Sequence, residues 1–178
     1  ITTDIALAVE YLERGEIIGL PTETVYGLAG NAFNEIAIRS IYTLKQRPAS
    51  NPLIVHASGV EQALLFVSRF PDKARLLADH FWPGPLTLLL DKTALISDLA
   101  TAGSKRVAIR VPQHPVALEL LSRLSFPLVA PSANPYTKVS PTRAEDVHAY
   151  FGNALPLILQ GGTCSKGLER SEEHTTEL

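Results

Sequence analysis

Apolar residues along the chain recur with two spacings, which predict helices that alternate with strands. The N-terminal segment shows the helical spacing, because its apolar residues fall three or four positions apart between residues 5 and 12. Thr3 and Asp4 can cap the start of this helix, and Gly15 can end it in a left-handed conformation. A short apolar run at Ile17–Leu20 follows and predicts a buried strand.

The same alternation continues along the rest of the chain. The spacings Ser58-x-x-Glu61 and Thr142-x-x-Glu145 predict capping boxes at two helix starts, and Pro48 should end the helix that begins at Asn34. Helices are predicted at residues 34–47, from residue 58, and at 71–82, 115–124 and 142–150, with strands at 53–55, 86–90, 107–111, 127–130 and 155–159. This pattern predicts an α/β domain with a substantial sheet, and it leaves open whether the strands are all parallel.

Length and composition narrow the class of protein. A chain of 178 residues is within the usual size of one domain, and 46% apolar with 19% charged residues is typical of a globular protein with a real core. The net charge of -2 argues against nucleic-acid binding by charge alone, although a local basic patch stays open. The one cysteine excludes an internal disulfide and fits a reducing compartment.

The apolar runs are short. Leu86–Leu90 is among the longest, far below the roughly 20 residues that a membrane-spanning helix needs, and the N-terminus shows no leader pattern. We therefore expect a cytoplasmic protein without membrane contact. Residues 169–178 are polar and acidic without periodicity, so we expect a domain at residues 1–168 followed by an exposed or disordered tail.

Two cations, Lys45 and Arg47, stand one residue apart just before Pro48. They could clamp a phosphate, because arginine offers a planar fork of donors and lysine a compact charge. They could instead neutralise the partial negative charge at a helix C-terminus. Spacing alone favours the second interpretation.

Hydroxyl groups and an imidazole flank this helix. Thr22, Thr24 and Tyr26 would project to one side of an extended segment, which suits a ligand site and the edge of a strand about equally well. His56 ends an apolar strand and could bind substrate, although a lone histidine is more often satisfied within a core.

The second half of the chain contains further polar candidates. Arg110 lies in an apolar strand, where it either faces solvent or pairs with an anion in a cleft. Ser132 and Asn134 follow another strand end, where ligands gather in layered α/β folds, but these residue types also form tight turns. Ser140 is explained by the start of the next helix, and Cys164 has no neighbouring base, so we interpret it as structural.

Two phosphate-binding motifs are missing from the sequence, the Walker G-x-x-x-x-G-K-[ST] run and G-x-G-x-x-G after a strand. The five histidines and one cysteine show no spacing typical of a metal cage, so no protein metal site is predicted. Any metal should be Mg²⁺ carried with phosphates. The residues alone predict a cleft that binds an anionic small molecule.

Six segments occur in a distinctive order, namely PTETVYGL, LKQRPASNPLIVH, FWPGPLTLLL, VAIRVP, APSAN and SPT. This order resembles the YrdC-like threonylcarbamoyl-AMP synthase family, from the first helix to residue 169. The resemblance implies an α/β, YrdC/RibB-like (DHBP synthase-like) fold, a twisted mixed sheet flanked by helices. It also implies a nucleotidyltransferase that makes L-threonylcarbamoyladenylate and pyrophosphate from L-threonine, bicarbonate and ATP. Downstream proteins would transfer the threonylcarbamoyl group to adenosine in tRNA.

The resemblance also implies roles for individual residues. Catalytic roles fall on Lys45, Arg47, Ser132 and Asn134. ATP contacts fall on Arg47, Asn51, Arg106, Ser132 and Ser140, although the family commonly has a small hydroxylated residue in place of Arg106. Threonine contacts fall on Thr24, His56, Arg110 and Ala130, the last through its backbone. Arg110 would pair with the threonine carboxylate, while Lys45, Arg47 and Mg²⁺ would neutralise phosphate charge.

The C-terminus departs from the family pattern, because Arg170 stands where the family has a serine that helps hold threonine. Other interpretations stay open. An RNA-binding module would use a basic cleft for at least weak contact, but the net charge argues against it. A YrdC-type domain could instead use carbamoyl phosphate, although the zinc-finger and acylphosphatase-like segments that usually accompany such domains are not present. A hydrolase based on Cys164 is a more distant alternative.

Overall fold

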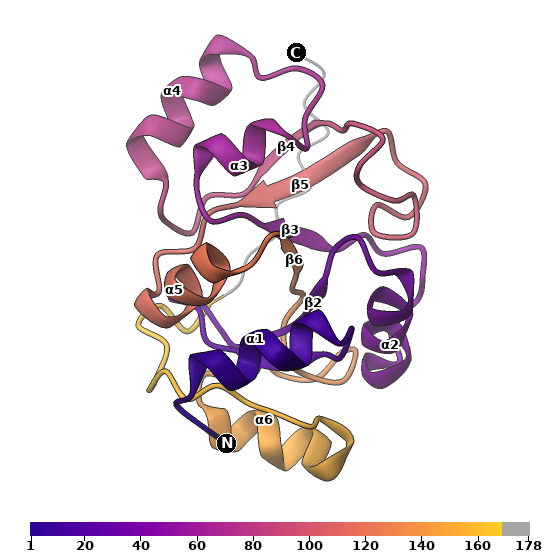
Figure 1. The fold of residues 1–178 in the computed structure, drawn as a ribbon, viewed down its shortest axis with the longest axis vertical. Helices are drawn as coiled ribbons and strands as arrows, with labels where there is room; N and C mark the ends of the chain where they lie inside the picture. The colour runs from indigo at the N-terminus through magenta and orange to yellow at the C-terminus, as the bar shows by residue number, and fades with distance from the viewer. Residues whose placement is uncertain (169–178) are drawn as a thin grey trace.

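A six-stranded mixed sheet organises the molecule (Figure 1). The computed structural model describes residues 1–168; the expected polar tail and Arg170 lie outside the described residues. The strands are β1 (Ile18–Leu20), β2 (Gly27–Asn31), β3 (Ile54–His56), β4 (Leu88–Asp91), β5 (Arg106–Arg110) and β6 (Leu128–Val129). Their spatial order is β1-β2-β6-β3-β5-β4. Strands β3 and β5 are parallel and the other neighbouring pairs are antiparallel, so the predicted mixed α/β fold is confirmed.

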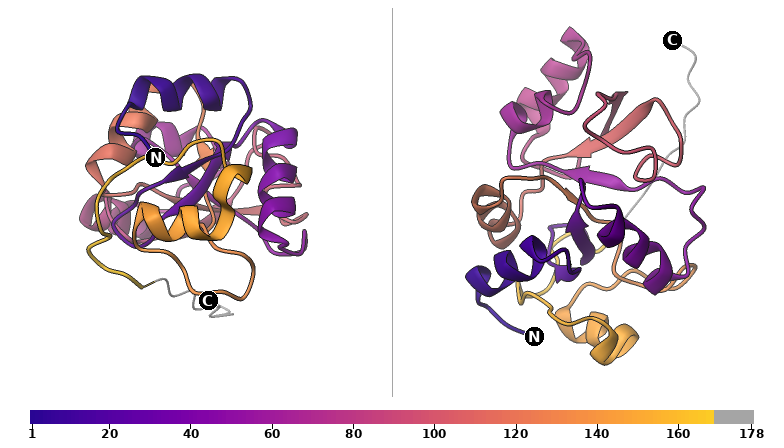
Figure 2. Two further views of the ribbon diagram at one scale, coloured as in Figure 1. Left: turned by 90° about the horizontal axis from the view of Figure 1, so that it is seen from below. Right: turned by 45° about the vertical axis from the view of Figure 1, so that its right-hand side comes forward.

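Helices cover both faces of this sheet. They are α1 (Ile5–Glu13), α2 (Glu35–Lys45), α3 (Val60–Leu64), α4 (Asp72–Phe81), α5 (Pro115–Arg123) and α6 (Ala144–Phe151), followed by the 3-10 helix η1 (Gly152–Ala154). Helices α1 and α5 share one apolar core with β1 and β6, whereas α2, α3, α4 and α6 contribute to a second core. The left view of Figure 2 shows α1 and α6 on opposite sides of the strands.

The two ends of the sheet differ in how they are covered. All residues of β1 and β6 are buried, and so are four of the five in β2. Strand β4 alternates between buried and exposed residues, because Leu88 packs into the core while Leu89 is 59% exposed. The pairing of Leu89 with Ala108 and of Ala108 with Ile54 places all three on one face, which is the less covered face of β3, β5 and β4.

Two predicted helix starts are confirmed by their caps. The Asp4 side chain accepts a hydrogen bond from the N–H of Leu7, and Asn34 accepts from Ile36 and Ala37. These bonds satisfy N–H groups that have no partner inside the helix. The end of α1 at Gly15 is also as predicted, because this residue has a φ of 82°.

The two predicted capping boxes are wrong. Helix α3 has Gly59 at its N-cap, and the N–H of Ser58 donates to the Gln62 side chain rather than to Glu61. The N-cap of helix α6 is Arg143, one residue after the predicted Thr142, and it has no side-chain cap. The main chain of Thr142 instead accepts a hydrogen bond from the N–H of Cys164, 2.9 Å away. Thr142 thus pairs with the C-terminal segment and does not cap the helix.

Strand prediction failed in two places. Strand β2 was missed because its sequence, GLAGN, has few residues with a preference for strands. Its Gly30 lets α2 approach closely, since an added Cβ would lie 3.2 Å from Ile41 Cδ1. The expected strand at residues 155–159 is reduced to single bridges, from Ile158 to Gly19 and from Leu159 to Thr2. Within residues 1–168, no helix is both long and apolar enough to cross a membrane.

Candidate functional site

Arg110 and His56 lie side by side at the ends of the parallel strands β5 and β3. Arg110 is 4% exposed and is held by three acceptors from two other segments. Its guanidinium donates to Glu23 Oε1 at 2.6 Å, to Thr24 Oγ1 at 3.1 Å and to the Gly84 carbonyl at 3.3 Å. Of the two interpretations of Arg110, burial in a charged cluster is therefore correct and a solvent-facing position is wrong. Two of its five N–H groups remain for a ligand, counting contacts within residues 1–168.

His56 is held neutral beside this cation. Burial, followed by the positive charge of Arg110, lowers the pKa of His56 to about 3, against a backbone hydrogen bond that raises it. Its Nδ1 lies 3.3 Å from the Ile54 carbonyl, which can only accept, so we assign the proton to Nδ1. The other nitrogen, Nε2, then carries a lone pair that can accept a hydrogen bond from a ligand.

The segment that contains Thr22, Thr24 and Tyr26 forms a tight turn rather than the edge of a strand. The Thr22 hydroxyl donates to the Val25 carbonyl at 2.6 Å, and the Thr22 and Thr24 hydroxyls lie 3.1 Å apart. The Tyr26 hydroxyl points elsewhere and donates to the Gly162 carbonyl. Only Thr24 therefore directs its hydroxyl toward Arg110.

Lys45 forms a second polar centre at the C-terminal end of α2. It is 1% exposed, and its ammonium donates to the carbonyls of Ser132 and Asn134, the latter at 2.6 Å. The Asn134 side-chain oxygen lies 3.4 Å away. A simple role at the helix C-terminus does not account for this geometry, because the side chain reaches across to another loop. Lys45, Ser132 and Asn134, three of the predicted catalytic residues, thus lie together.

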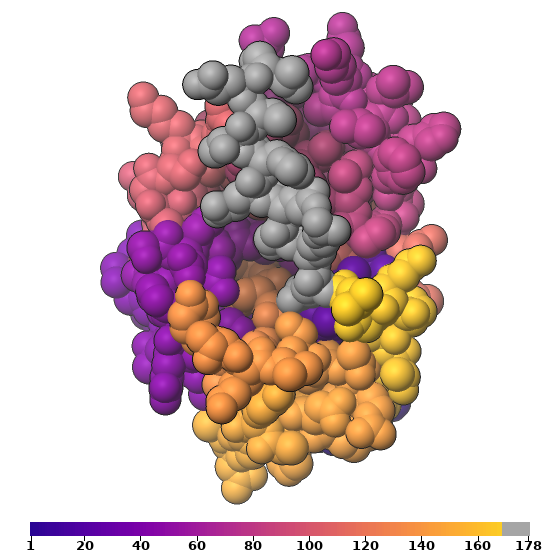
Figure 3. Space-filling view, turned by 180° about the vertical axis from the view of Figure 1, so that it is seen from behind, coloured from indigo at the N-terminus to yellow at the C-terminus, as the bar shows by residue number. Residues whose placement is uncertain are grey.

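Hydrogen-bonded loops connect the two centres. The N–H of Ala133, between Ser132 and Asn134, donates to the Tyr26 carbonyl at 2.7 Å. Ala130 donates its N–H to the Ile54 carbonyl, two residues before His56. The segments that carry the threonine and catalytic candidates therefore share one side of the molecule. Figure 3 shows purple, orange and yellow segments, around residues 45–57, 132–143 and 160–168, on the face seen from behind.

The nucleotide candidates divide into two groups. Arg47 donates to the carbonyls of Asn51 and Pro52, and the Asn51 amide donates to the Tyr136 hydroxyl at 3.1 Å. These contacts join the loop after α2 to the loop that follows Asn134. Ser140 directly precedes Pro141, whose carbonyl accepts from the N–H of Tyr26. It therefore lies next to the Thr24 turn.

Arg106 lies apart from this group. It begins β5, four residues and about 13 Å along the strand from Arg110. Its guanidinium forms a loose ion pair with Asp91 at 3.8 Å, and both side chains are more than 60% exposed. The structure thus places Arg106 at the opposite end of β5 from the threonine candidates.

Two residues of this region were missed from the sequence. Glu23 is 5% exposed and pairs with Arg110, and Tyr136 receives the hydrogen bond from Asn51. Periodicity gave no sign of Glu23, because its segment follows neither a helical nor a strand pattern. All residues from Ile17 to Gly30 are buried, and an acid inside such a run needs a cation partner.

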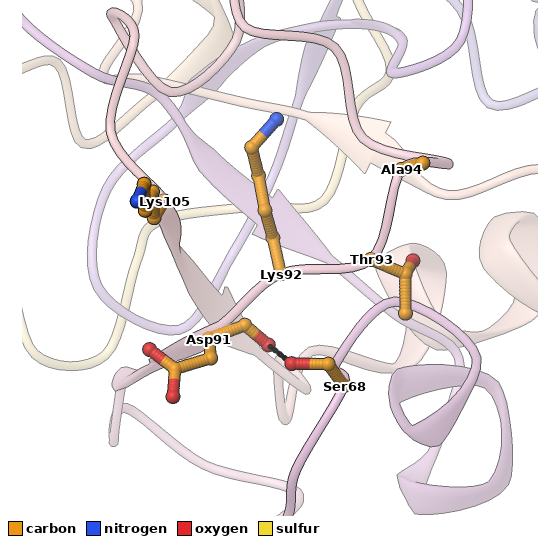
Figure 4. Close-up of a pocket in the computed structure, with 6 residues that line it drawn as sticks. All are labelled: Ser68, Asp91, Lys92, Thr93, Ala94 and Lys105. Atoms are coloured by element: carbon orange, nitrogen blue, oxygen red, sulfur yellow. Dashed lines mark hydrogen bonds between the residues drawn. The ribbon is translucent and has the colours of Figure 1, made fainter.

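The rest of the described molecule offers fewer alternatives. Across residues 1–168, no three His, Cys, Asp or Glu side chains are grouped so that they could hold a metal ion. A surface pocket of about 470 Å³ is lined by Ser68, Asp91, Lys92, Thr93, Ala94 and Lys105, and contains none of the predicted site residues (Figure 4). The Lys92 ammonium there lies 2.7 Å from Asp98, so its charge is already paired.

The fold and the two polar centres define a class of protein, an α/β domain that gathers buried cations, hydroxyls and a neutral imidazole at the strand ends of a mixed sheet. Residues 10–171 match the Sua5/YciO/YrdC family model, which is described as telomere recombination. The chain belongs to this family.

Curated relatives support this assignment. Threonylcarbamoyl-AMP synthase of Pyrococcus abyssi is 41% identical over 173 residues, which cover 97% of this chain and 51% of that protein. The synthase of Bacillus subtilis is 45% identical over 166 residues, covering 93% and 48%. A crystal structure of P. abyssi Sua5 complexed with L-threonine superposes with a TM-score of 0.91 and 42% identity, covering 93% of this chain and 48% of that one. The chain spans about half the length of these relatives.

Proposed function

We propose that this chain carries the synthase domain that makes L-threonylcarbamoyladenylate and pyrophosphate from L-threonine, bicarbonate and ATP. The observation that carries the proposal is the cluster of Arg110, Thr24 and neutral His56 at adjacent strand ends, next to the loop anchored by Lys45. Relatives that bear the synthase name, and a relative crystallised with L-threonine, add support.

The Arg110 centre suits an amino acid. The two remaining N–H groups of Arg110 can donate to an α-carboxylate, which is a charge-assisted and therefore strong interaction. The Thr24 hydroxyl already accepts from Arg110, so its own proton is available to an acceptor on the ligand or to Thr22. His56 Nε2 can accept from an N–H or O–H of the amino acid. These groups bind and orient threonine without supplying a nucleophile.

The Lys45 centre and the adjacent loops suit a nucleotide. Arg47, Asn51, Ser132 and Ser140 lie on loops that meet beside the Thr24 turn, and Lys45 and Asn134 hold that meeting point. Mg²⁺ would arrive with ATP and be held through phosphate oxygens, because the described residues present no acidic cluster to replace them. The ion would neutralise phosphate charge, a role to which Arg47 would add.

The reaction needs alignment more than covalent catalysis. The threonine amine bonds to the carbon of CO₂ derived from bicarbonate and loses a proton, which gives a carbamate. A carbamate oxygen then bonds to the α-phosphorus of ATP, and the bond between that phosphorus and the bridging oxygen breaks as pyrophosphate leaves. Holding the two substrates in line supplies much of the rate enhancement. The product would pass to proteins that modify tRNA, and this use would suit a cytoplasmic location.

Release of pyrophosphate from ATP tests the proposal directly. We expect release only when L-threonine and bicarbonate are both present. Release that ignores threonine, or that carbamoyl phosphate supports instead, would favour a domain that adenylates a different carbamoyl substrate. Binding of tRNA that weakens steeply with salt, without any pyrophosphate release, would favour an RNA-binding module.

A matched pair of variants tests the site. Thr24→Val keeps the shape but removes the hydroxyl that contacts Arg110, so we expect the KM for threonine to rise about tenfold. Thr43→Val makes the same change on the exposed side of α2 and should leave the KM unchanged. Equal KM values for the two variants would contradict the assignment of Thr24.

A further inference from the structure

Among the residues that the structure describes, Glu23 is the one buried acid. Its Oε1 lies 2.6 Å from Arg110 Nη2, and both side chains are at most 6% exposed. Two unit charges so close in a partly dry environment largely cancel each other's field. The Arg110 centre is therefore close to neutral before any ligand binds.

Glu23 is also fixed in place. Its second carboxylate oxygen, Oε2, accepts the N–H of Gln113 at 3.0 Å. Its main-chain carbonyl accepts the N–H of Lys166 at 2.9 Å. Because both ends of the residue are held, Glu23 cannot swing away when a ligand reaches Arg110, so it acts as a permanent counter-ion.

A permanent counter-ion changes which ligands suit this centre. A lone buried arginine attracts any anion, and phosphate groups are among its strongest partners. A neutral Glu–Arg pair discriminates against a dianion, which meets the carboxylate as well as the guanidinium. A zwitterion has no such disadvantage, because its ammonium faces a centre that contains a negative charge. The nucleotide loops lie close by, so a phosphate misplaced at Arg110 would block threonine.

We propose that Glu23 is a specificity-determining residue that keeps the amino-acid end of the site neutral, so that this end takes a zwitterionic amino acid and rejects phosphate groups. This inference rests on the proposed function for the identity of the amino acid. It adds a role for a residue that touches Arg110 and orients it without contacting the reacting atoms.

Inorganic phosphate is the probe. Threonine binding is measured by calorimetry without nucleotide, at increasing phosphate concentration. In the unmodified chain we expect the Kd for threonine to be independent of phosphate. In Glu23→Gln, which removes the charge but keeps one acceptor for Arg110, we expect phosphate to compete and to raise the apparent Kd at least about tenfold. Glu23→Asp keeps the charge and should exclude phosphate as the unmodified chain does, even if its shorter reach weakens threonine binding.

Glu35→Gln is the matched control. It removes a carboxylate that also pairs with an arginine, but on the exposed surface of α2, so net charge changes equally without any effect at Arg110. Phosphate that competes with threonine in the unmodified chain would overturn the inference. So would phosphate competition in Glu35→Gln equal to that in Glu23→Gln, or indifference to phosphate in Glu23→Gln. A purely structural role for Glu23 predicts that phosphate has no effect on Glu23→Gln. It also predicts that both Glu23 variants lose the same affinity for threonine.

Two further measurements apply if Glu23→Gln does not fold or if the unmodified chain does not bind threonine. If thermal unfolding shows that Glu23→Gln is unfolded at the assay temperature, the inference is tested with the unmodified chain and Glu23→Asp. Phosphate competition with threonine in either one rejects the inference. If threonine does not bind the unmodified chain, the proposed function fails. Glu23 is still tested then, by direct titration of Glu23→Gln and the unmodified chain with phosphate alone, where only the variant should bind.

Discussion

The two halves of the sheet bury their residues differently. In β1, β2 and β6 both faces are covered by helices, and the side chains that alternate along these strands belong to two apolar cores. In β3, β5 and β4 one face packs on α3 and α4, while the other carries Leu89, Arg106 and Asp91 with large exposed fractions. The same face of the same sheet is thus a core at one end and a surface at the other.

This difference shows where the polar residues of the site can be accommodated. Arg110 and His56 extend from the less covered half, at the point where it meets the loops of the fully covered half. A buried cation there is held by hydrogen-bonded strands and lies on the less covered face of the sheet. The covered half contributes Thr24, Ser132 and Asn134 to the candidate site through its loops, and the less covered half contributes Arg110 and His56.

The largest expected effect comes from breaking the ion pair at this junction. Arg110→Met keeps much of the volume but leaves Glu23 buried without its cation, which should lower the free energy of unfolding by about 3–5 kcal/mol. Threonine binding should be lost. Arg106→Met, on the same face of the same strand but exposed, should change stability by less than about 0.5 kcal/mol. Denaturant unfolding and calorimetry measure both. Restored stability in Glu23→Gln/Arg110→Met would confirm the cause.

The second largest effect is expected for a buried leucine, compared with an exposed leucine on the same face of the sheet. Leu128 in β6 is 0% exposed, and Leu128→Ala should cost about 2–5 kcal/mol through lost burial and the cavity left behind. Leu89 in β4 is 59% exposed, and Leu89→Ala should cost less than about 0.5 kcal/mol. Similar losses for the two variants in urea unfolding would mean that the β4 end is as covered as the β6 end.

A smaller effect follows from the neutral His56. Its pKa is about 3 in the folded state and about 6.5 in the unfolded chain, so the unfolded chain binds a proton that the folded state refuses. The contribution of neutral His56 to the free energy of unfolding is fully present above pH 6.5. It is lost as the pH falls towards 3, by at most about 1.4 kcal/mol per pH unit.

His56→Gln should therefore show a shallower decline of unfolding free energy between pH 6.5 and 4.5 than the unmodified chain. Chemical unfolding at a series of pH values measures the two slopes. Parallel slopes would show that His56 takes up its proton over the same pH range in the folded and unfolded states, and would contradict its being held neutral by the fold.

The smallest effect concerns the start of α2, whose far end holds Lys45. Asn34→Ala removes the cap for Ile36 and Ala37 and should cost about 1 kcal/mol, while Asn34→Asp retains it. Threonine affinity should stay constant in both, because Lys45 is anchored independently by the carbonyls of Ser132 and Asn134. A fall in affinity that follows the loss of stability would show that the cap and the site are coupled.

Local sequence predicted the helices and strands well where a single local interaction determines where they begin or end. The Asp4 and Asn34 caps, the end of α1 at Gly15 and most strand positions needed only periodicity and the preferences of single residues. The capping boxes failed because the N-caps are Gly59 and Arg143 rather than Ser58 and Thr142. Strand β2 was missed because its small residues are selected by the close approach of α2.

The candidate site divides in the same way. The order of motifs predicted Thr24, His56, Arg110, Lys45, Ser132 and Asn134 as site residues, and the family that this order resembles is confirmed. Which of these residues touch one another, and that Arg110 has Glu23 as its partner, could not follow from spacing, because the pairs are up to 89 positions apart in the chain. Sequence determined the chemical groups available to this protein. Tertiary structure decided their charge balance, because burial and the nearest counter-ion exist only once the chain is folded.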